Sequence, residues 1–292
     1  MTYQTPAGMK LKPEVIICNP ESLKQTIDNM RLDGAEKLHI LTDFDRTLTR
    51  AYDDEGNNFT SIFANLRRDG YLDPEYVKIS REHYEKYYPI EIDYNRSFDE
   101  RANYMREWWD AAHADMIQFG VTKTLLDRVC AEHPLFFRDG ALDLFRDTFA
   151  KNIPFVIMSA APGYMIKRYI NNFDRVYDNI FIVANWYEFD ANGKMIAAKE
   201  PVVHSLNKYE ITLESLPIFD EIKKRPNVIL MGDGIDDTGM VTGFDYNNLI
   251  KIGFYNQMTD EHLELYKQNF DVVITGDDGM GYVNEILAQI LT

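Results

Sequence analysis

The chain has 292 residues, which allows one elaborated domain or a core with a lid of roughly 100 residues. Hydrophobic residues make up 45% and aromatic residues 13%, values that exclude a disordered chain. Two cysteines, Cys18 and Cys130, are too few for a disulfide framework, and a formal charge of −16 disfavours a polymeric nucleic acid as substrate.

The N-terminal segment has no basic stretch followed by an apolar run. No later stretch approaches the roughly 18 consecutive apolar residues of a membrane span. We therefore expect a cytoplasmic protein that does not contact a membrane. We also expect a monomer whose partner is a small molecule.

The first predicted helix follows Asn19, with Pro20 at its first position and Gly34 at its C-terminal cap. Its packing face is predicted by three apolar residues at helical spacing, Leu23, Ile27 and Met30. The run KLHILTDF then predicts a buried strand that ends at acidic residues.

Residues 51–135 are helical in pattern and rich in tyrosine and tryptophan, which is typical of an inserted cap. One helix is predicted to open at Asp73, and Pro89 is expected to end it. Ser97 and Glu100 have the spacing of a capping box, which predicts the start of a longer helix.

From residue 136 onward, apolar strands alternate with helices, which predicts a parallel sheet covered by helices. The predicted strands are IPFVIMSA, NIFIVAN, NVILMGD, LIKIGFY and VVITG, and Asn192-Gly193 predicts a β-hairpin. The fold class is therefore α/β. Residues 1–50 and 136–292 are expected to form a Rossmann-like core with an N-terminal helical extension at 1–35, and residues 51–135 a helical cap.

Two carboxylates follow the first predicted strand, Asp43 and Asp45. In an extended segment, residues i and i+2 point to the same side, so both carboxylates face one space. One can attack phosphorus while the other protonates the leaving oxygen and later deprotonates water. The alternative is a strand that ends in solvated acidic turn residues.

Three later segments strengthen the catalytic interpretation. Ser159 is expected at a strand tip, where its hydroxyl can donate to a phosphoryl oxygen. Lys208 can neutralise the nucleophile and the incoming phosphate. Asp233 follows another strand, with Asp236 and Asp237 close behind, and converging carboxylates favour Mg²⁺. Taken singly, these residues are more often a turn serine, a surface lysine and a Gly/Asp-rich turn.

The order of these four segments resembles the motif pattern of the haloacid dehalogenase superfamily. Over nearly its full length the chain is similar to the cytosolic 5′-nucleotidase type III family, also called pyrimidine 5′-nucleotidases. The resemblance rests on LTDFDRTLTR, HYEKYYPIEIDY, YMREWWDAAH, NWYEFDANG, SLNK, LMGDG and LIKIGFYN. The cap segments are the specific part, because the core motifs occur across many phosphatases.

The resemblance implies a role for each candidate residue. Asp43 is the expected nucleophile and Asp45 the acid/base. Mg²⁺ is expected on the Asp43 side chain, the Asp45 carbonyl and Asp233. The remaining implied roles are phosphate binding by Ser159, Ala160 and Lys208, nucleoside binding by Glu91 and Trp109, and support by Thr47 and Asp237. From the residues alone, a solvated carboxylate is the favoured explanation of Glu91, and a core position of the cap helix is that of Trp109.

The chain departs from the family pattern at Ala112, at Ser-Ala-Ala-Pro-Gly-Tyr in the second motif, and over residues 53–70. We expect Mg²⁺-dependent hydrolysis of a nucleoside 5′-monophosphate, such as UMP or CMP, through a phosphoaspartate. The alternatives are a phosphatase of a sugar phosphate or phosphoserine, and a non-catalytic nucleotide-binding protein. A phosphotransferase would use the same intermediate.

Overall fold

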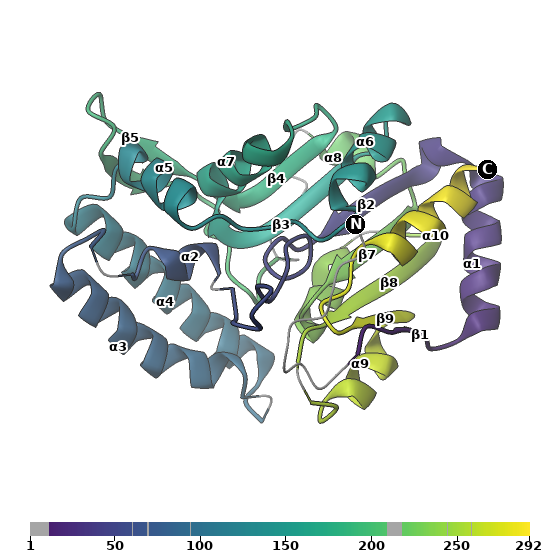
Figure 1. The fold of residues 1–292 in the computed structure, drawn as a ribbon, viewed down its shortest axis with the longest axis horizontal. Coiled ribbons are helices and arrows are strands. Elements are labelled where there is room, and N and C mark those ends of the chain that lie inside the picture. Colours follow the sequence, from purple (N-terminus) through teal and green to yellow (C-terminus); the bar gives the residue numbers. More distant parts are fainter. Residues whose placement is uncertain are drawn as a thin grey trace.

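Seven short apolar strands form the main sheet, in the order β1-β9-β8-β7-β2-β3-β4 (Figure 1). The computed structural model describes residues 12–59, 61–68, 70–93, 95–208, 218–243, 245–257 and 259–292. The strands are β1 Val15–Ile17, β2 Leu38–Thr42, β3 Phe155–Pro162, β4 Ile180–Asn185, β7 Asn227–Gly232, β8 Asn248–Tyr255 and β9 Val272–Thr275. Only β1 runs antiparallel to its neighbour among these strands, so the predicted parallel sheet is confirmed.

Helices cover both faces of this sheet, because alternate residues of each strand point to opposite sides. Ile40 faces one apolar cluster and Leu41 the other, and both are fully buried. Each such side chain contributes roughly 1.5–3 kcal/mol by leaving water. The first cluster includes α1 Pro20–Asp33, α6 Ala141–Ala150, α7 Gly163–Phe173 and α10 Gly281–Leu291, and the second includes α8 Phe219–Ile222, the 3₁₀ helix η3 Ile235–Val241 and α9 Leu263–Asn269.

The central strand β2 lies between β3 and β7, with Leu41 in register with Val156 and Leu230. All five residues of β2 are buried. Residues just after β2, β3 and β7 therefore meet at one edge of the sheet, which is where ligands bind in open α/β folds.

A second group of helices lies at the end of the molecule opposite α1 (Figure 1). We call this group the cap, and it consists of α2 Ile62–Asn65, α3 Pro74–Glu91, α4 Phe98–Gln118 and α5 Lys123–Glu132. Helices α3 and α4 pack through Tyr87 and Trp108, whose stacked rings lie 5.7 Å apart. Leu206, from a loop of the core, is buried in the same cluster. The cap is therefore packed onto the core next to Lys208.

Two smaller elements complete the described fold. The predicted hairpin forms β5 Tyr187–Phe189 and β6 Met195–Ala198, and Gly193 supplies the positive φ of 78° that its turn requires. The 3₁₀ turn η1 Ala35–Lys37 joins α1 to β2. None of the helices in the described ranges combines the length and apolar character needed to cross a bilayer.

The predicted helix starts are confirmed at all three caps, and Asp73 accepts from the Glu75 N–H at 2.8 Å. Asn19 accepts from the Ser22 N–H at 3.0 Å, and Ser97 accepts from the Glu100 N–H at 3.2 Å. One prediction is wrong: α3 does not end at Pro89 but continues to Glu91. Pro89 is exposed and lies in the last turn, so the helix loses little more than one hydrogen bond there.

The strand β1 was not predicted, because only three residues form it. Its partner β9 lies more than 250 residues away in the chain. Nothing local in so short an apolar run distinguishes a strand from a loop. The part of the N-terminal extension within residues 1–11 lies outside the described residues.

Candidate active site

A pocket of about 460 Å³ lies where the strand ends meet the cap. The core contributes charged and small residues, and half of the residues from the cap side are aromatic. The core residues are Asp43, Asp45, Arg46, Ser159, Ala160, Ala161, Ser205 and Lys208, and the aromatic residues are Phe59, Phe63, Tyr84, Tyr88, Trp108 and Trp109. A ligand in this pocket would meet a polar end and an aromatic end.

Asp43 occupies the tip of the central strand. Its backbone N–H donates to the Met231 carbonyl at 3.0 Å, which extends the pairing of β2 with β7 by one residue. The Lys208 Nζ lies 2.6 Å from one carboxylate oxygen of Asp43, and the Thr47 hydroxyl donates to the other at 3.5 Å. The carboxylate is therefore held in a fixed orientation, as a nucleophile requires.

Lys208 bridges two carboxylates, because its Nζ also lies 2.7 Å from Asp237. Burial alone would lower the pKa of Lys208, but Asp237 and Asp43 outweigh it and raise the pKa. A cation that stays charged beside the nucleophile can attract a phosphate.

Gly232 allows Asp237 to come this close to the sheet. A Cβ on Gly232 would lie 2.4 Å from the Asp237 Cβ, which no side chain could tolerate. The Gly234 N–H donates to Asp237 at 2.9 Å. Asp237 is therefore held by the backbone of its own loop as well as by Lys208.

Asp45 lies in the same pocket and accepts from the Ile62 N–H at 3.4 Å. Burial and the nearby charge of Asp43 raise the pKa of Asp45 to about 7. A carboxyl group with a pKa near 7 can donate a proton and take one back at neutral pH.

The turn after Asp45 is held by a buried ion pair. Arg46 has a positive φ of 61°, a conformation that is strained for a residue with a side chain. The Arg138 guanidinium donates to the carbonyls of Arg46 and Thr47 at 2.7 and 2.9 Å, and lies 3.0 Å from Asp277. Arg138 and Asp277 were not predicted as site residues, since neither is near Asp43 in sequence.

Three carboxylates converge beside Lys208. Single oxygens of Asp43, Asp233 and Asp237 all lie within 4.8 Å of one another. Burial and repulsion from Asp43 and Asp237 raise the pKa of Asp233 to about 8, and burial raises that of Asp43 to about 6. The donor set is all oxygen and carries excess negative charge, so it fits a hard divalent cation such as Mg²⁺.

Ser159 and Ala160 lie on β3, on the side of the pocket next to Asp43. The Ser159 hydroxyl is buried and accepts from the Ala161 N–H at 3.1 Å, which leaves its proton available to an acceptor in the pocket. The Ala160 carbonyl accepts from Asn185 at 2.7 Å and from the Trp109 indole at 3.3 Å. The strand end is thereby tied to the cap.

The structure distinguishes the two adjacent tryptophans of α4. Both line the pocket, but Trp108 is buried in the cap, whereas Trp109 is partly exposed. The rings of Trp109 and Phe63 are nearly parallel, at 25°, with centroids 6.0 Å apart. Trp109 therefore offers a flat apolar face to a ligand rather than filling the interior of the cap.

Glu91 also lines the pocket, at the last residue of α3. Burial and the charge of Asp236 raise its pKa. Arg101 donates to the Glu91 carbonyl at 3.1 Å and reaches Asp236 of the core at 3.4 Å. Arg101 thus links the end of α3 to the loop that carries Asp233.

The pocket brings together most of the residues singled out in the sequence. Asp43, Asp45, Ser159, Ala160, Lys208, Glu91 and Trp109 line it, and Thr47, Asp233 and Asp237 surround Asp43. Sequence reasoning missed the pocket residues Arg46, Phe63, Arg67, Tyr84 and Tyr88. The helical spacing of Tyr84, Tyr88 and Glu91 along α3 was the available signal for part of this set.

A family model, described as pyrimidine 5′-nucleotidase (UMPH-1), matches residues 46–291. The chain belongs to the pyrimidine 5′-nucleotidase (UMPH-1) family. The resemblance proposed from the motifs is confirmed, and the chain is an enzyme of the 5′-nucleotidase class.

The names of similar proteins are consistent with this family. The 7-methylguanosine phosphate-specific 5′-nucleotidase of Mus musculus is 31% identical over 283 residues, which cover 96% of this chain and 94% of the relative. Form B of that enzyme from Xenopus laevis is 32% identical over 277 residues, which cover 94% and 95%.

Solved structures support the same conclusion. A cytosolic 5′-nucleotidase IIIB bound to cytidine superposes with a TM-score of 0.87 at 26% identity, covering 94% of this chain and 93% of the other. A substrate-bound phosphoserine phosphatase, at a TM-score of 0.52 and 17% identity, covering 86% of this chain and 97% of the other, shares the fold alone. The chain therefore has the haloacid dehalogenase-type core with a helical cap, as predicted.

Proposed function

We propose that this 5′-nucleotidase hydrolyses nucleoside 5′-monophosphates through a phosphoaspartate at Asp43. The observation that carries the proposal is one pocket lined both by Asp43 and Lys208 from the core and by Trp109 from the cap. The polar end fits a phosphate, and the aromatic end fits a base. A small sugar phosphate would leave the aromatic end without a partner.

In the first step, an Asp43 oxygen attacks phosphorus and the bond to the 5′ oxygen breaks. Asp45, whose pKa of about 7 keeps a proton available, protonates that oxygen as the nucleoside leaves. In the second step Asp45 takes a proton from water, the water oxygen attacks phosphorus, and phosphate is released from Asp43. Lys208 and Ser159 bind the phosphoryl oxygens throughout.

The proposed cofactor is Mg²⁺, held by the Asp43 side chain, the Asp45 carbonyl and Asp233. Bound there, the ion would offset the charge of the phosphate and the carboxylates. Asp237 is better placed for support, because both of its oxygens already accept hydrogen bonds from Lys208 and Gly234. Burial and the neighbouring carboxylates raise the pKa of Asp233, and a bound cation would lower it.

UMP and CMP remain the first candidate substrates, in keeping with the family description and with the cytidine in the IIIB structure. The names of the curated relatives make 7-methylguanosine 5′-monophosphate a second candidate. Its methylated base is cationic, and the pocket offers aromatic faces and the Glu91 carboxylate, which both attract a cation.

A phosphate-release screen separates these possibilities. The substrates are UMP, CMP, 7-methylguanosine 5′-monophosphate, ribose 5-phosphate and phosphoserine, each with Mg²⁺ and with EDTA. We expect at least about tenfold higher kcat/KM for the best nucleotide than for ribose 5-phosphate, equivalent to about 1.4 kcal/mol. Equal or faster hydrolysis of the sugar phosphate or phosphoserine would reject the nucleotide assignment.

The cytoplasmic location and the monomeric state stay predictions. The word cytosolic occurs in the names of a Caenorhabditis elegans relative and of the IIIB structure, which supports the proposed location. Sedimentation of the purified protein would test the oligomeric state.

A further inference from the structure

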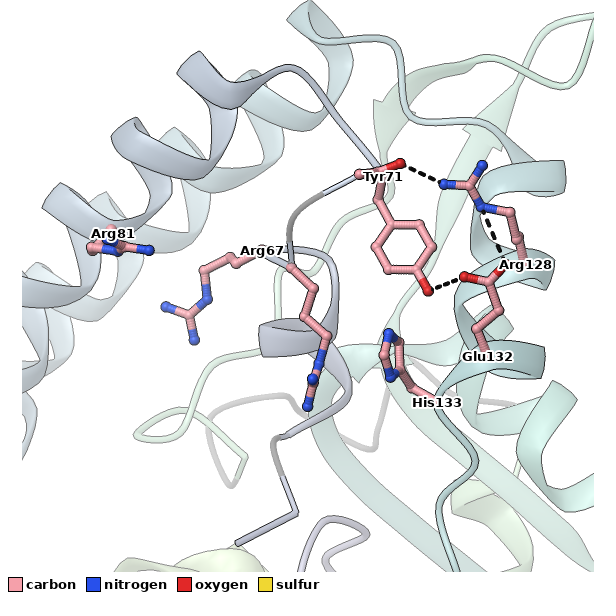
Figure 2. Close-up of a pocket in the computed structure, with 8 residues that line it drawn as sticks. Arg67, Tyr71, Arg81, Arg128, Glu132 and His133 are labelled. Atoms are coloured by element: carbon pink, nitrogen blue, oxygen red, sulfur yellow. Dashed lines mark hydrogen bonds and ion pairs between the residues drawn. The ribbon is translucent and has the colours of Figure 1, made fainter. Parts of the chain in front are cut away.

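A second pocket, of about 750 Å³ and open to solvent, lies against the cap (Figure 2). Three parts of the cap line it: the segment after α2, helix α3, and the C-terminal part of α5. The lining residues are Arg67, Arg68, Gly70, Tyr71, Arg81, Arg128, Glu132 and His133. Arg67 lines the catalytic pocket as well, so the two pockets share one wall.

The charge of this pocket is opposite to that of the chain. Four of its eight lining residues are arginines and one is a glutamate, in a protein with a formal charge of −16. Burial and the charge of Arg68 lower the pKa of His133, which disfavours the charged form of the imidazole. A local concentration of guanidinium groups on an acidic protein favours an anionic ligand.

One side of the pocket is internally paired. Arg128 donates to the Gly70 carbonyl at 2.8 Å, lies 3.8 Å from Glu132 and stacks over the Tyr71 ring at 4.7 Å. These contacts fix the guanidinium while leaving part of its donor set unused, since an arginine has five N–H donors. The Arg128 guanidinium is thus held in place while it keeps N–H donors for a ligand.

The other side carries two arginines, Arg67 and Arg81. Within the described part of the chain, neither Arg67 nor Arg81 forms an ion pair or a side-chain hydrogen bond, and Figure 2 shows them extending toward one another. Burial and the charge of Arg81 lower the pKa of Arg67. Two facing guanidinium groups repel each other unless an anion lies between them.

We propose that this arginine pocket binds a di- or triphosphate group. The planar forks of arginine match phosphate oxygens in bidentate fashion. A chain of phosphates can reach both the Arg67–Arg81 side and the Arg128 side, which a single phosphate would do less well. The group could belong to inorganic polyphosphate or to a nucleoside triphosphate, since the recognised chemistry is the same.

A ligand bound in this pocket would affect the catalytic pocket through Arg67, which lines both. The Arg67 guanidinium lies 4.9 Å from the ring centroid of Tyr84, which lines the aromatic end of the catalytic pocket. An anion that draws Arg67 away from this ring changes the surface that a nucleoside meets. The ligand is therefore expected to alter KM for the nucleotide more than kcat.

Isothermal titration with tripolyphosphate and with ATP, both in Mg²⁺-free buffer, tests the proposal. We expect the double variant Arg81→Gln/Arg128→Gln to bind tripolyphosphate at least tenfold more weakly than the wild type. The matched control is Arg146→Gln, an exposed arginine of α6 that pairs with Asp143 and Asp174. The control should bind like the wild type, and Lys208→Ala should retain the site, because Lys208 belongs to the catalytic pocket.

The outcomes separate the pocket from other sources of binding. Equal affinities for tripolyphosphate and ATP would assign recognition to the phosphate chain, and tighter ATP binding would add a nucleoside contact; both support the site. Unchanged binding by the double variant, or loss in Lys208→Ala alone, would overturn it. An equal loss in Arg146→Gln would show unspecific attraction and would overturn it too.

Discussion

The two ends of the catalytic pocket are built in different ways. At the phosphate end, Asp43 and Lys208 are buried, and Lys208 donates to Asp43 at 2.6 Å and to Asp237 at 2.7 Å. At the nucleoside end, Phe63 and Trp109 contact each other only through their rings, 6.0 Å apart.

From this difference we expect the residues that catalyse the reaction to be distinct from those that select the substrate. The residues of the phosphate end directly follow buried parallel strands, which restrict the positions that their side chains can take. The nucleoside end stands on the cap and on residues 58–67, whose pocket residues include Asn58, Phe59, Ser61, Phe63, Ala64 and Arg67. Substitutions at the first end should abolish turnover, and substitutions at the second should change which ester is preferred.

The largest effect is expected from Asp43→Asn, because the amide is nearly isosteric but cannot attack phosphorus. We expect kcat to fall at least about 1,000-fold on every substrate. Asp45→Asn should lose roughly 100-fold through the lost proton transfers. Phosphate release is the measurement, and circular dichroism verifies the fold. More than a few per cent of wild-type activity in Asp43→Asn, with deamidation excluded by mass spectrometry, would reject the nucleophile.

Removal of Mg²⁺ should act on the phosphate end alone. We expect EDTA to lower kcat at least about 100-fold on nucleotides and on p-nitrophenyl phosphate alike, and added Mg²⁺ to restore it. Ca²⁺ should restore it poorly, because its larger radius and looser coordination disturb the alignment of Asp43 with phosphorus. Full activity in excess EDTA would contradict the proposed metal site.

A smaller effect is expected from substitution of Arg101, which links the end of α3 in the cap to Asp236 of the core. Arg101→Met keeps the apolar length of the side chain but removes its donors to Glu91 and Asp236. We expect about fivefold lower kcat/KM for the nucleotide, roughly 1 kcal/mol, mainly through KM. The control Arg96→Met removes an exposed arginine that pairs with Asp93 and Glu100. Equal losses in the two variants would mean that the link to the core is unimportant.

The smallest effect concerns pH and stability. Burial raises the pKa of Asp43 to about 6 and that of Asp233 to about 8, so their ionisation destabilises the metal-free fold as pH rises through these values. Mg²⁺ binds only the ionised forms and should offset this loss. We therefore expect Mg²⁺ to raise Tm by about 2 °C more at pH 8 than at pH 5.5, roughly 1 kcal/mol.

Thermal unfolding with and without Mg²⁺ measures this difference. At each pH, the rise in Tm on adding Mg²⁺ is measured against the metal-free protein at the same pH. This comparison cancels the contributions of His39, His113 and His204, whose lowered pKa values change stability in the opposite direction at low pH. Asp233→Asn should abolish the increment at both pH values. An equal increment at pH 5.5 and pH 8 in the wild type would show that Mg²⁺ does not bind to these carboxylates.

Much of the phosphate end could be predicted from the sequence, because each residue follows a recognisable apolar strand or a known motif. Asp43, Ser159 and Asp233 all fit this description. Their convergence follows from the parallel sheet, since the carboxyl ends of neighbouring strands share an edge. The distance of 2.6 Å between Lys208 and Asp43 could not be predicted, because 165 residues separate them.

The nucleoside end was less predictable. Trp109 was singled out only through the family resemblance, and its neighbour Trp108 has the same local pattern but is buried. Phe63 and Arg67 lie in the segment 53–70 that resembles the family least. Their positions depend on how α2 packs against the end of β3, which no local pattern encodes. The end of α3 was misplaced because Pro89 is exposed and lies in the last turn, where a proline removes little more than one hydrogen bond.

The most direct test compares one nucleotide with p-nitrophenyl phosphate in the variants Trp109→Ala and Glu91→Ala. Stacking on the indole contributes roughly 1–3 kcal/mol, so kcat/KM for the preferred nucleotide should fall at least about tenfold. Hydrolysis of p-nitrophenyl phosphate, which lacks ribose and base, should fall much less. Glu107→Ala, on an exposed position of α4, should change neither. Equal losses on both substrates in Trp109→Ala and Glu91→Ala would contradict the separation of a phosphate end from a nucleoside end.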